Sequence, residues 1–223
     1  MDKLLSNIKI EVSQSIYLKD PQTSTLGQKI ITGSIELIDS VGFEAFTFKK
    51  LGVEIGSNES SIYRYFESKH KLLTYLSSWY WGWLEYRFVF ETHNINDKIQ
   101  KLKKGIEVVT RSIEVDSNFS YVDESKLNRI IINESSKSYL IKEVDEVNKE
   151  GHFETYKRLV RRFSELILQV NPSYAAALSL SSMVIENSLH QHFLKSHLKS
   201  ITNCDESYDP TQFFTDLTLK AIS

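Results

Sequence analysis

Apolar residues recur every three or four positions along most of the chain, which is the spacing of amphipathic helices. The first clear stripe contains Leu26, Ile30, Leu37 and Val41, and Gly42 follows it at a position where many helices end in a left-handed turn. No short alternating runs recur at regular spacing, and the chain has only three prolines and eight glycines. The pattern therefore predicts an all-α fold.

Two shorter helices are expected directly after this one, within residues 47–73. Thr47 is placed to cap the second helix, Gly56 to supply a tight turn, and Asn58 to cap the third helix. Two short helices joined by such a turn are typical of a helix-turn-helix, which places one helix in the major groove of DNA. We therefore expect an N-terminal three-helix helix-turn-helix domain, followed by a larger C-terminal helical domain.

The remaining pattern predicts helices almost to the end of the chain. Asn96 and Asn171-Pro172 are expected to start two of them, and Gly151 to interrupt or bend a third. The expected helical ranges are 69–92, 96–115, 124–134, 136–170, 172–200 and 211–222, with a loop over 116–123. Arg158, Arg161 and Arg162 are interpreted as a solvated face.

Three domains or segments follow from this pattern. Residues 1–23 are an N-terminal extension, expected to be a short helix or an arm lying on the body, and Asp20-Pro21 ends it. Residues 24–73 form the helix-turn-helix DNA-binding domain. Residues 74–223 form a larger C-terminal helical domain.

Composition adds constraints but does not by itself indicate DNA binding. The net charge is −2, the pI is about 6.3 and 41% of residues are hydrophobic, so a sizeable core is available without a basic excess. Segment 24–73 is itself neutral, so a basic DNA-binding face must come from the placement of charges. Its cations, Lys29, Lys49, Lys50, Arg64, Lys69 and Lys71, are balanced by Glu36, Asp39, Glu44, Glu54, Glu59 and Glu67.

Other kinds of chemistry have little support in the sequence. Cys204 is the only cysteine, and no apolar run approaches the length of a membrane span, so a cytoplasmic protein without a membrane role is expected. His190, His192 and His197 do not have the spacing of a metal site. We expect no catalytic residues, no metal and no cofactor.

The strongest motif runs from residue 51 to residue 73 and reads LGVEIGSNESSIYRYFESKHKLL. With Gly42-Phe43 and Thr47 before it, this segment resembles the DNA-binding domain of TetR-family transcriptional regulators. The resemblance implies a homodimer, most often a repressor, that binds a palindromic DNA operator. It also implies release by a small molecule in the C-terminal domain, and pairing of the last two helices with their copies in a four-helix dimer bundle.

The same resemblance implies roles for individual residues. Thr47 and Lys69 would contact phosphate, and Tyr63 and Tyr65 phosphate or sugar. The first turn of the third helix would face the groove, where Glu59 is unusual because a carboxylate repels phosphate unless it accepts from cytosine. Helix geometry adds Lys49, Lys50 and Arg64 as outward-pointing cations and predicts that the polar tips of Tyr63 and Tyr65 also point outward. The expected DNA-binding residues are Thr47, Lys49, Lys50, Asn58, Glu59, Ser60, Ser61, Tyr63, Arg64, Tyr65 and Lys69.

Half of residues 75–90 are aromatic, and several of them form one helical stripe. They are interpreted either as core or as the wall of a cavity for a small, apolar or aromatic effector. In TetR-like proteins this helix joins the two domains. The candidate ligand-binding residues are Trp79, Trp83, Tyr86, Phe90, Tyr139, Tyr156, Met183 and Asn187.

Two other functions remain open at this point. One is a dimeric helical ligand-binding or scaffold protein whose helix-turn-helix serves only for packing and does not bind DNA. The other is a DNA-binding regulator without an effector. Clustering of cations on one face would favour DNA binding, whereas their dispersal would favour the scaffold.

Overall fold

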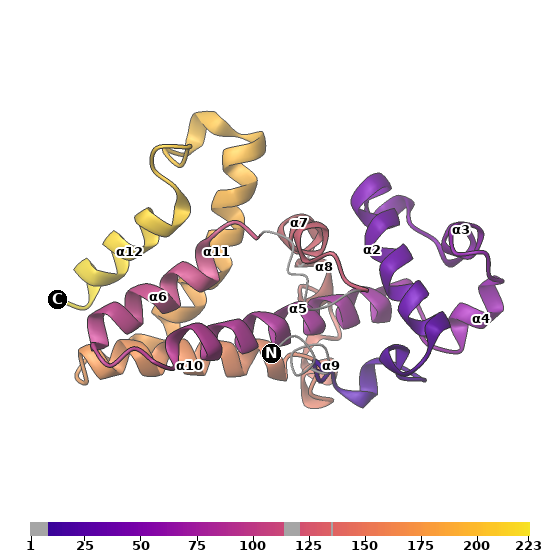
Figure 1. Ribbon diagram of the computed structural model, residues 1–223, viewed down its shortest axis with the longest axis horizontal. Helices are drawn as coiled ribbons and strands as arrows, with labels where there is room; N and C mark the ends of the chain where they lie inside the picture. The colour runs from indigo at the N-terminus through magenta and orange to yellow at the C-terminus, as the bar shows by residue number, and fades with distance from the viewer. Residues whose placement is uncertain (1–8, 114–120, 135) are drawn as a thin grey trace. The chain divides into compact units, whose positions relative to one another are not determined.

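The computed structural model describes residues 9–113, 121–134 and 136–223, and every regular element in these ranges is helical (Figure 1). The all-α prediction is therefore confirmed. Two compact units are present: the first comprises the described residues of Met1–Tyr80 and Ile113–Glu154, and the second comprises Trp81–Ser112 and Thr155–Ser223. Among the described helices, none is both long and apolar enough to cross a bilayer.

The first unit contains the three predicted N-terminal helices, α2 (Thr25–Ala45), α3 (Phe48–Glu54) and α4 (Glu59–Tyr63). Gly42 interrupts α2 with a φ of 77°, a conformation that glycine adopts without the steric cost of a side chain. The predicted helix end at Gly42 is therefore confirmed, although a short helical segment continues to Ala45.

The N-terminal extension is an arm that lies on the first unit, one of the two forms expected for it. Only short 3-10 turns interrupt it, η1 (Gln14–Ile16) and η2 (Pro21–Thr23), while residues 1–8 lie outside the described ranges. Ile10, Val12 and Ile16 are buried, so the arm contributes to the core of the unit.

The arm passes very close to the first turn of α2. A Cβ atom placed on Gly27 would lie 2.2 Å from the Pro21 carbonyl oxygen, far inside van der Waals contact. Because the neighbouring atom belongs to the backbone, neither side can easily move away. Glycine at position 27 is thus required for the arm to dock where it does.

We predict that Gly27→Ala destabilises the protein by about 1–3 kcal/mol, the usual cost of overpacking. Alanine favours helices over glycine by about 1 kcal/mol, so a loss of stability would report the clash and not helix propensity. Urea unfolding followed by circular dichroism measures the effect, with the exposed Ser40→Ala on the same helix as control. Unchanged stability of Gly27→Ala would contradict the close approach.

Helix α5 (Lys69–Thr92) begins in the first unit and ends in the second, and most of its aromatic side chains are buried. Trp79 and Trp83 are almost fully buried, as the core interpretation expects. Within the second unit, Phe88 packs against Phe163 with ring centroids 6.0 Å apart. Burial of such large rings is a major source of stability for both units.

The second unit also contains α6 (Lys98–Thr110), α10 (Glu154–Val170), α11 (Ala177–His197) and α12 (Pro210–Ala221). The buried Glu85 carboxylate on α5 accepts hydrogen bonds from Arg158 at 2.7 Å and from Arg162 at 2.7 Å. Burial raises the pKa of Glu85, but these two arginines outweigh it and hold the pKa below its usual value. Arg161 and Arg162 are exposed, as the solvated-face interpretation expects, whereas Arg158 is half-buried, and the ion pairs of Arg158 and Arg162 with Glu85 were not predicted.

Helix boundaries after α5 differ from the prediction in several places. Asp97, and not Asn96, caps α6, because its carboxylate accepts the Gln100 N–H at 2.8 Å. The expected helical region 136–170, predicted to be interrupted or bent near Gly151, consists of α8 (Ser136–Tyr139), α9 (Val144–Lys149) and α10, so an interruption at Gly151 is confirmed. Gly151, with a φ of 81°, lies between α9 and α10. Helix α7 (Glu124–Glu134) matches its predicted range, whereas most of the expected loop 116–123 lies outside the described residues.

The predicted start of the next helix at Asn171-Pro172 is also wrong, because α11 begins at Ala177. The Asn171 side chain instead closes a turn by accepting the Ser173 N–H, and its amide donates to the Ile222 carbonyl at 2.9 Å. The residues after α11 form the short turn η3 (Lys199–Ile201), and Asp209 then caps α12.

A half-buried histidine joins α11 to the end of α6. Nε2 of His192 donates to the Thr110 carbonyl at 2.7 Å. Burial lowers the pKa of His192 from 6.5, and the hydrogen bond to Thr110 only partly opposes this effect. The folded state thus favours the neutral imidazole more than the unfolded state does.

We predict that stability falls as the pH drops below about 6.5, because the unfolded chain then binds a proton at His192 more readily than the folded chain. His192→Gln should make this loss less steep. Thermal unfolding between neutral and mildly acidic pH provides the measurement. An identical pH profile for wild type and His192→Gln would disprove the assignment.

Candidate DNA-binding site

The tight turn between α3 and α4 depends on two glycines. A Cβ atom on Gly52 would lie 2.7 Å from the Ser57 carbonyl oxygen, so a side chain there would push the two helices apart. Gly56 has a φ of 65°, a left-handed conformation that other residues rarely adopt. Behind the turn, Leu51 and Ile62 are fully buried and hold the two helices together.

Both helix starts are capped by the residues that the sequence predicts. The Thr47 hydroxyl accepts the Lys50 N–H at 3.2 Å, and the Asn58 side chain accepts the Ser61 N–H at 2.8 Å. The hydroxyls of Ser60 and Ser61 also donate to the Asn58 side-chain oxygen, at 2.8 and 2.7 Å. These bonds order the first turn of the recognition helix α4 before any DNA is bound.

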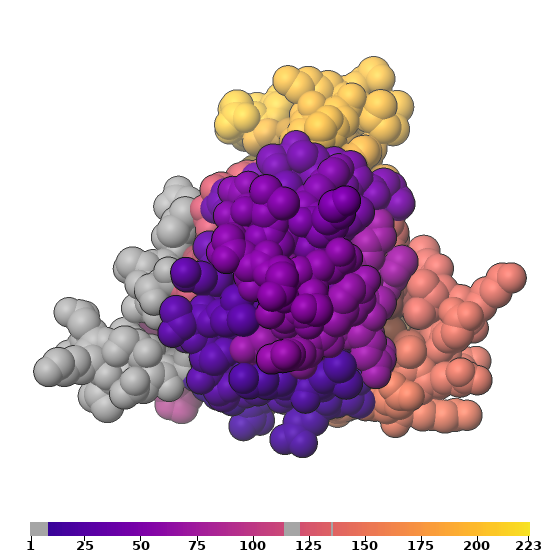
Figure 2. All heavy atoms as spheres, turned by 90° about the vertical axis from the view of Figure 1, so that its right-hand side faces the viewer, coloured from indigo at the N-terminus to yellow at the C-terminus, as the bar shows by residue number. Residues whose placement is uncertain are grey.

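Most of the candidate DNA-binding residues lie on the surface of this module, which Figure 2 shows in purple facing the viewer. Glu59 and Ser61 are half-buried. Tyr63 is 47% exposed while its ring packs edge-on against Phe48. The exposed candidates are Thr47, Lys49, Lys50, Asn58, Ser60, Tyr63 and Arg64.

Two of the candidate lysines have partners inside the protein. Lys69 donates to the carbonyls of Phe43 and Glu44, at 3.1 and 3.2 Å, and lies over the Phe43 ring. Lys50 donates to the Ala45 carbonyl at 2.7 Å. Both ammonium groups therefore satisfy backbone carbonyls at the end of α2. A contact with phosphate would have to share or replace these hydrogen bonds.

Tyr65 is placed differently from the expectation that its polar tip points outward. Its side chain is only 3% exposed, and its hydroxyl shares a hydrogen bond of 2.8 Å with Ser24. The physical reason is that the chain leaves α4 at Arg64 and turns Tyr65 back against the start of α2. The predicted outward orientation of Tyr65 is therefore wrong. Its side chain instead packs against the start of α2 and holds the end of the recognition helix in place.

A row of ion pairs joins α2 to α7 and α8 within the first unit, and we call it the ionic seam. Lys126 pairs with Glu36 at 2.5 Å, Arg129 forms a two-pronged pair with Asp39 at 2.9 and 2.7 Å, and Lys137 pairs with Glu44 at 2.7 Å. The hydrogen bond from Lys137 also holds the pKa of Glu44 below its usual value.

The ionic seam was not predicted from the sequence. Its acidic residues belong to the helix-turn-helix segment and its basic residues lie about 90 positions later. A signal was present only in the spacing: Glu36 and Asp39 lie three apart on one helix, as do Lys126 and Arg129 on another. The seam explains how much of the acidic charge of segment 24–73 is neutralised outside that segment.

We predict that Glu36→Lys weakens the ionic seam by placing like charges together, and that adding Lys126→Glu restores it. Surface pairs of this kind contribute about 0.2–1 kcal/mol, so the coupling energy in a double-mutant cycle should lie in that range. Urea unfolding of the four proteins measures it. Charge reversal at Lys104, whose ion pair lies within α6, serves as a control for general charge effects. Purely additive effects at Glu36 and Lys126 would contradict the seam.

The candidate ligand-binding residues have different environments. Tyr86 and Phe90 stack 6.0 Å apart and line an open hollow of about 400 Å³. Tyr156 packs against Trp81, and Tyr139 is half-buried. The structure therefore brings Tyr86 and Phe90 to one cavity wall. The other candidates lie in the core or on helix surfaces: Trp79, Trp83, Tyr139, Tyr156, Met183 and Asn187.

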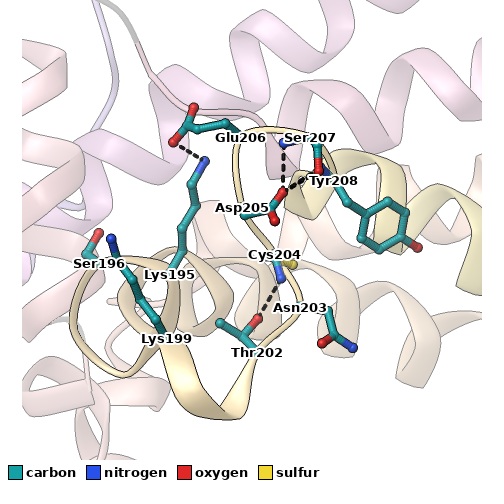
Figure 3. Close-up of a pocket in the computed structure, with 10 residues that line it drawn as sticks. All are labelled: Lys195, Ser196, Lys199, Thr202, Asn203, Cys204, Asp205, Glu206, Ser207 and Tyr208. Atoms are coloured by element: carbon teal, nitrogen blue, oxygen red, sulfur yellow. Dashed lines mark hydrogen bonds and ion pairs between the residues drawn. The ribbon is translucent and has the colours of Figure 1, made fainter.

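A larger hollow of about 780 Å³ lies beside the loop between α11 and α12 (Figure 3). Lys195 pairs with Glu206 at 3.1 Å across it, and Asp205 accepts hydrogen bonds from Ser207. The Cys204 N–H donates to the Thr202 hydroxyl. Its polar groups therefore bond largely to one another and stabilise the loop.

The ordered helix-turn-helix with an exposed recognition helix places the chain among the helix-turn-helix DNA-binding proteins. Residues 30–76 match the family model described as bacterial regulatory proteins, tetR family. This segment therefore carries the DNA-binding domain of that family, and the resemblance seen in the sequence is confirmed for these residues. No curated protein matches the sequence significantly.

Solved structures share the fold across nearly the whole chain. The fatty acid degradation regulator FadR from Bacillus halodurans is 16% identical, with 90% of this chain and 96% of that chain covered and a TM-score of 0.57. A tetR-family regulatory protein from Rhodococcus RHA1 is 13% identical, with the same coverage and a TM-score of 0.57. AibR in complex with isovaleryl coenzyme A and operator DNA is 13% identical, with 86% and 96% covered and a TM-score of 0.53. Identities this low show a shared fold.

Proposed function

We propose that this regulator acts as a homodimer that binds a palindromic DNA operator through the starts of α3 and α4. A small molecule bound in the C-terminal helical region would then weaken or release the complex. Repression is the expected outcome of operator binding, since a protein seated on an operator blocks access to that DNA. The cytoplasm is the expected compartment because the operator lies there.

The observation that carries the proposal is the arrangement of exposed groups around α4. Asn58 and Ser60 are exposed at its first turn, and Tyr63 and Arg64 are exposed at its end. Lys49 is exposed on α3. A helix start carrying small polar side chains suits base edges, while cations and a phenol beside it suit the flanking phosphates.

Dimerisation follows from the symmetry of the DNA. Two recognition helices reach two half-sites only if two chains are related by a two-fold axis. Leu178 and Met183 on α11 are 56% and 39% exposed and supply apolar surface for such an interface. We propose that α11 and α12 pair with their copies in a four-helix arrangement.

The effector is proposed to be a small molecule with an apolar or aromatic part. Tyr86 and Phe90 are the candidate residues that share a cavity wall, so they are the first to test. AibR, which has the same fold, was solved with both isovaleryl coenzyme A and operator DNA, so this fold accommodates both kinds of partner. An acyl derivative is therefore a sensible first member of a ligand screen.

Selection of bound duplexes from a random DNA pool tests the proposal, followed by fluorescence anisotropy on the selected site. We expect a palindromic sequence. Lys49→Ala should bind it about fivefold more weakly at physiological salt for each phosphate contact removed. Tyr63→Phe removes only a hydroxyl and should cost about 1 kcal/mol, while the ring keeps its packing against Phe48.

Lys101→Ala on α6 provides the matched control, because it removes one lysine in the second unit. Selection of no palindrome, together with wild-type affinity in Lys49→Ala and Tyr63→Phe, would reject the proposal. That result would favour the scaffold alternative, in which the helix-turn-helix serves only for packing. A DNA-binding protein that no screened ligand affects would instead favour a regulator without an effector.

A further inference from the structure

The N-terminal arm is bonded to the end of the recognition helix. The Leu18 N–H donates to the Tyr65 carbonyl at 2.8 Å, and the Lys19 ammonium lies 5.1 Å from the centre of the Tyr65 ring. The hydroxyl of the same tyrosine shares its hydrogen bond with Ser24 at the start of α2. Tyr65 is therefore surrounded by the arm, α2 and the recognition helix.

The arm is held in this place by further contacts within the first unit. The Gln22 side chain donates to the Ile10 carbonyl at 2.8 Å and accepts from the Tyr121 hydroxyl at 2.9 Å. Lys9 pairs with Asp20 at 2.5 Å, which fixes the two ends of the arm to each other. Lys19 is thus carried on an ordered segment, and Figure 2 shows this indigo segment bordering the lower edge of the purple helix-turn-helix.

Lys19 adds a cation beside the helix-turn-helix, in which some of the lysines already bond to groups within the protein. Lys50 and Lys69 are engaged with backbone carbonyls at the end of α2. Among the described residues of the arm and the helix-turn-helix, the side chains of Lys19, Lys29, Lys49 and Arg64 are exposed and make no ion pair or hydrogen bond within the chain. Lys19 and Lys29 lie outside the segment that matches the family model, which begins at residue 30, and Lys19 lies over Tyr65 directly after the recognition helix.

We propose that the N-terminal arm is part of the DNA-binding surface and that Lys19 contacts a phosphate of the DNA backbone beside the recognition helix. The inference rests on the proposed function, since it requires that the helix-turn-helix binds DNA. Arg64 and Tyr63 are exposed at the end of α4, next to the tyrosine over which Lys19 lies. While the start of α4 is in the groove, its end faces the phosphates that border the groove.

A phosphate is the chemical partner that fits this position best. An ammonium group on a flexible stem binds phosphate as a point charge and does not need a fixed angle. Contacts of this kind contribute equally on all sequences, because phosphates carry no base identity. Lys19 therefore strengthens binding and orients the recognition helix, whereas base selection remains with the first turn of α4.

The experiment compares wild type with Lys19→Ala, Lys19→Arg and Lys98→Ala in fluorescence anisotropy over a series of salt concentrations. Two probes are used, the selected palindrome and a shuffled duplex of the same length. We expect Lys19→Ala to weaken binding to both probes about fivefold for each protomer at physiological salt, and to lower the salt slope by about 0.9 per protomer. Lys19→Arg should retain both values, as should Lys98→Ala on α6.

The outcomes separate this inference from the proposed function. Suppose that the affinity of wild type for the palindrome falls steeply with salt concentration and that Lys19→Ala keeps the full salt slope. The phosphate contact is then disproved and the proposed function stands. If Lys19→Ala lowers the melting temperature of the free protein but leaves the slope intact, Lys19 only supports Tyr65, and the inference is again overturned. If wild type binds no DNA at all, the proposed function fails, and this inference fails with it.

Discussion

The whole DNA-binding surface depends on holding one very short helix in place. Helix α4 spans only Glu59–Tyr63, far below the length at which an isolated helix is stable in water. Its start is ordered by the Asn58 cap, its middle is anchored by the buried Ile62, and its end is fixed by Tyr65. The function of the surrounding elements in the first unit is therefore largely to provide these anchors.

Electrostatics in the first unit follow from the same need for rigidity. Lys50 on α3 and Lys69 at the start of α5 satisfy backbone carbonyls at the end of α2, and the ionic seam joins acidic residues of α2 to basic residues of α7 and α8. Both arrangements use charge for internal structure and leave few cations for DNA. A neutral helix-turn-helix segment is thus compatible with DNA binding, because Lys49 and Arg64 remain exposed at the surface while several acids are already paired.

Local features of the fold could be predicted from the sequence, whereas long-range ones could not. The sequence predicts the helix caps at Thr47 and Asn58 and the turn at Gly56 correctly, because each depends only on residues close to it in the chain. Tyr65 was expected to point outward, because a helical pattern cannot show that the chain turns inward after Arg64. The ionic seam depends on contacts between distant segments, which periodicity does not reveal, whereas the interruption of region 136–170 at Gly151 was predicted.

The central claim is that the start of α4 lies in the major groove of DNA, and methylation interference at guanine N7 tests it most directly. N7 lies in the major groove, so a methyl group there blocks a recognition helix but not a protein that binds elsewhere on the duplex. The account predicts interference in two half-sites on one face of the selected DNA, at least roughly one helical turn apart. Tight binding that is unaffected by N7 methylation in either half-site would contradict it.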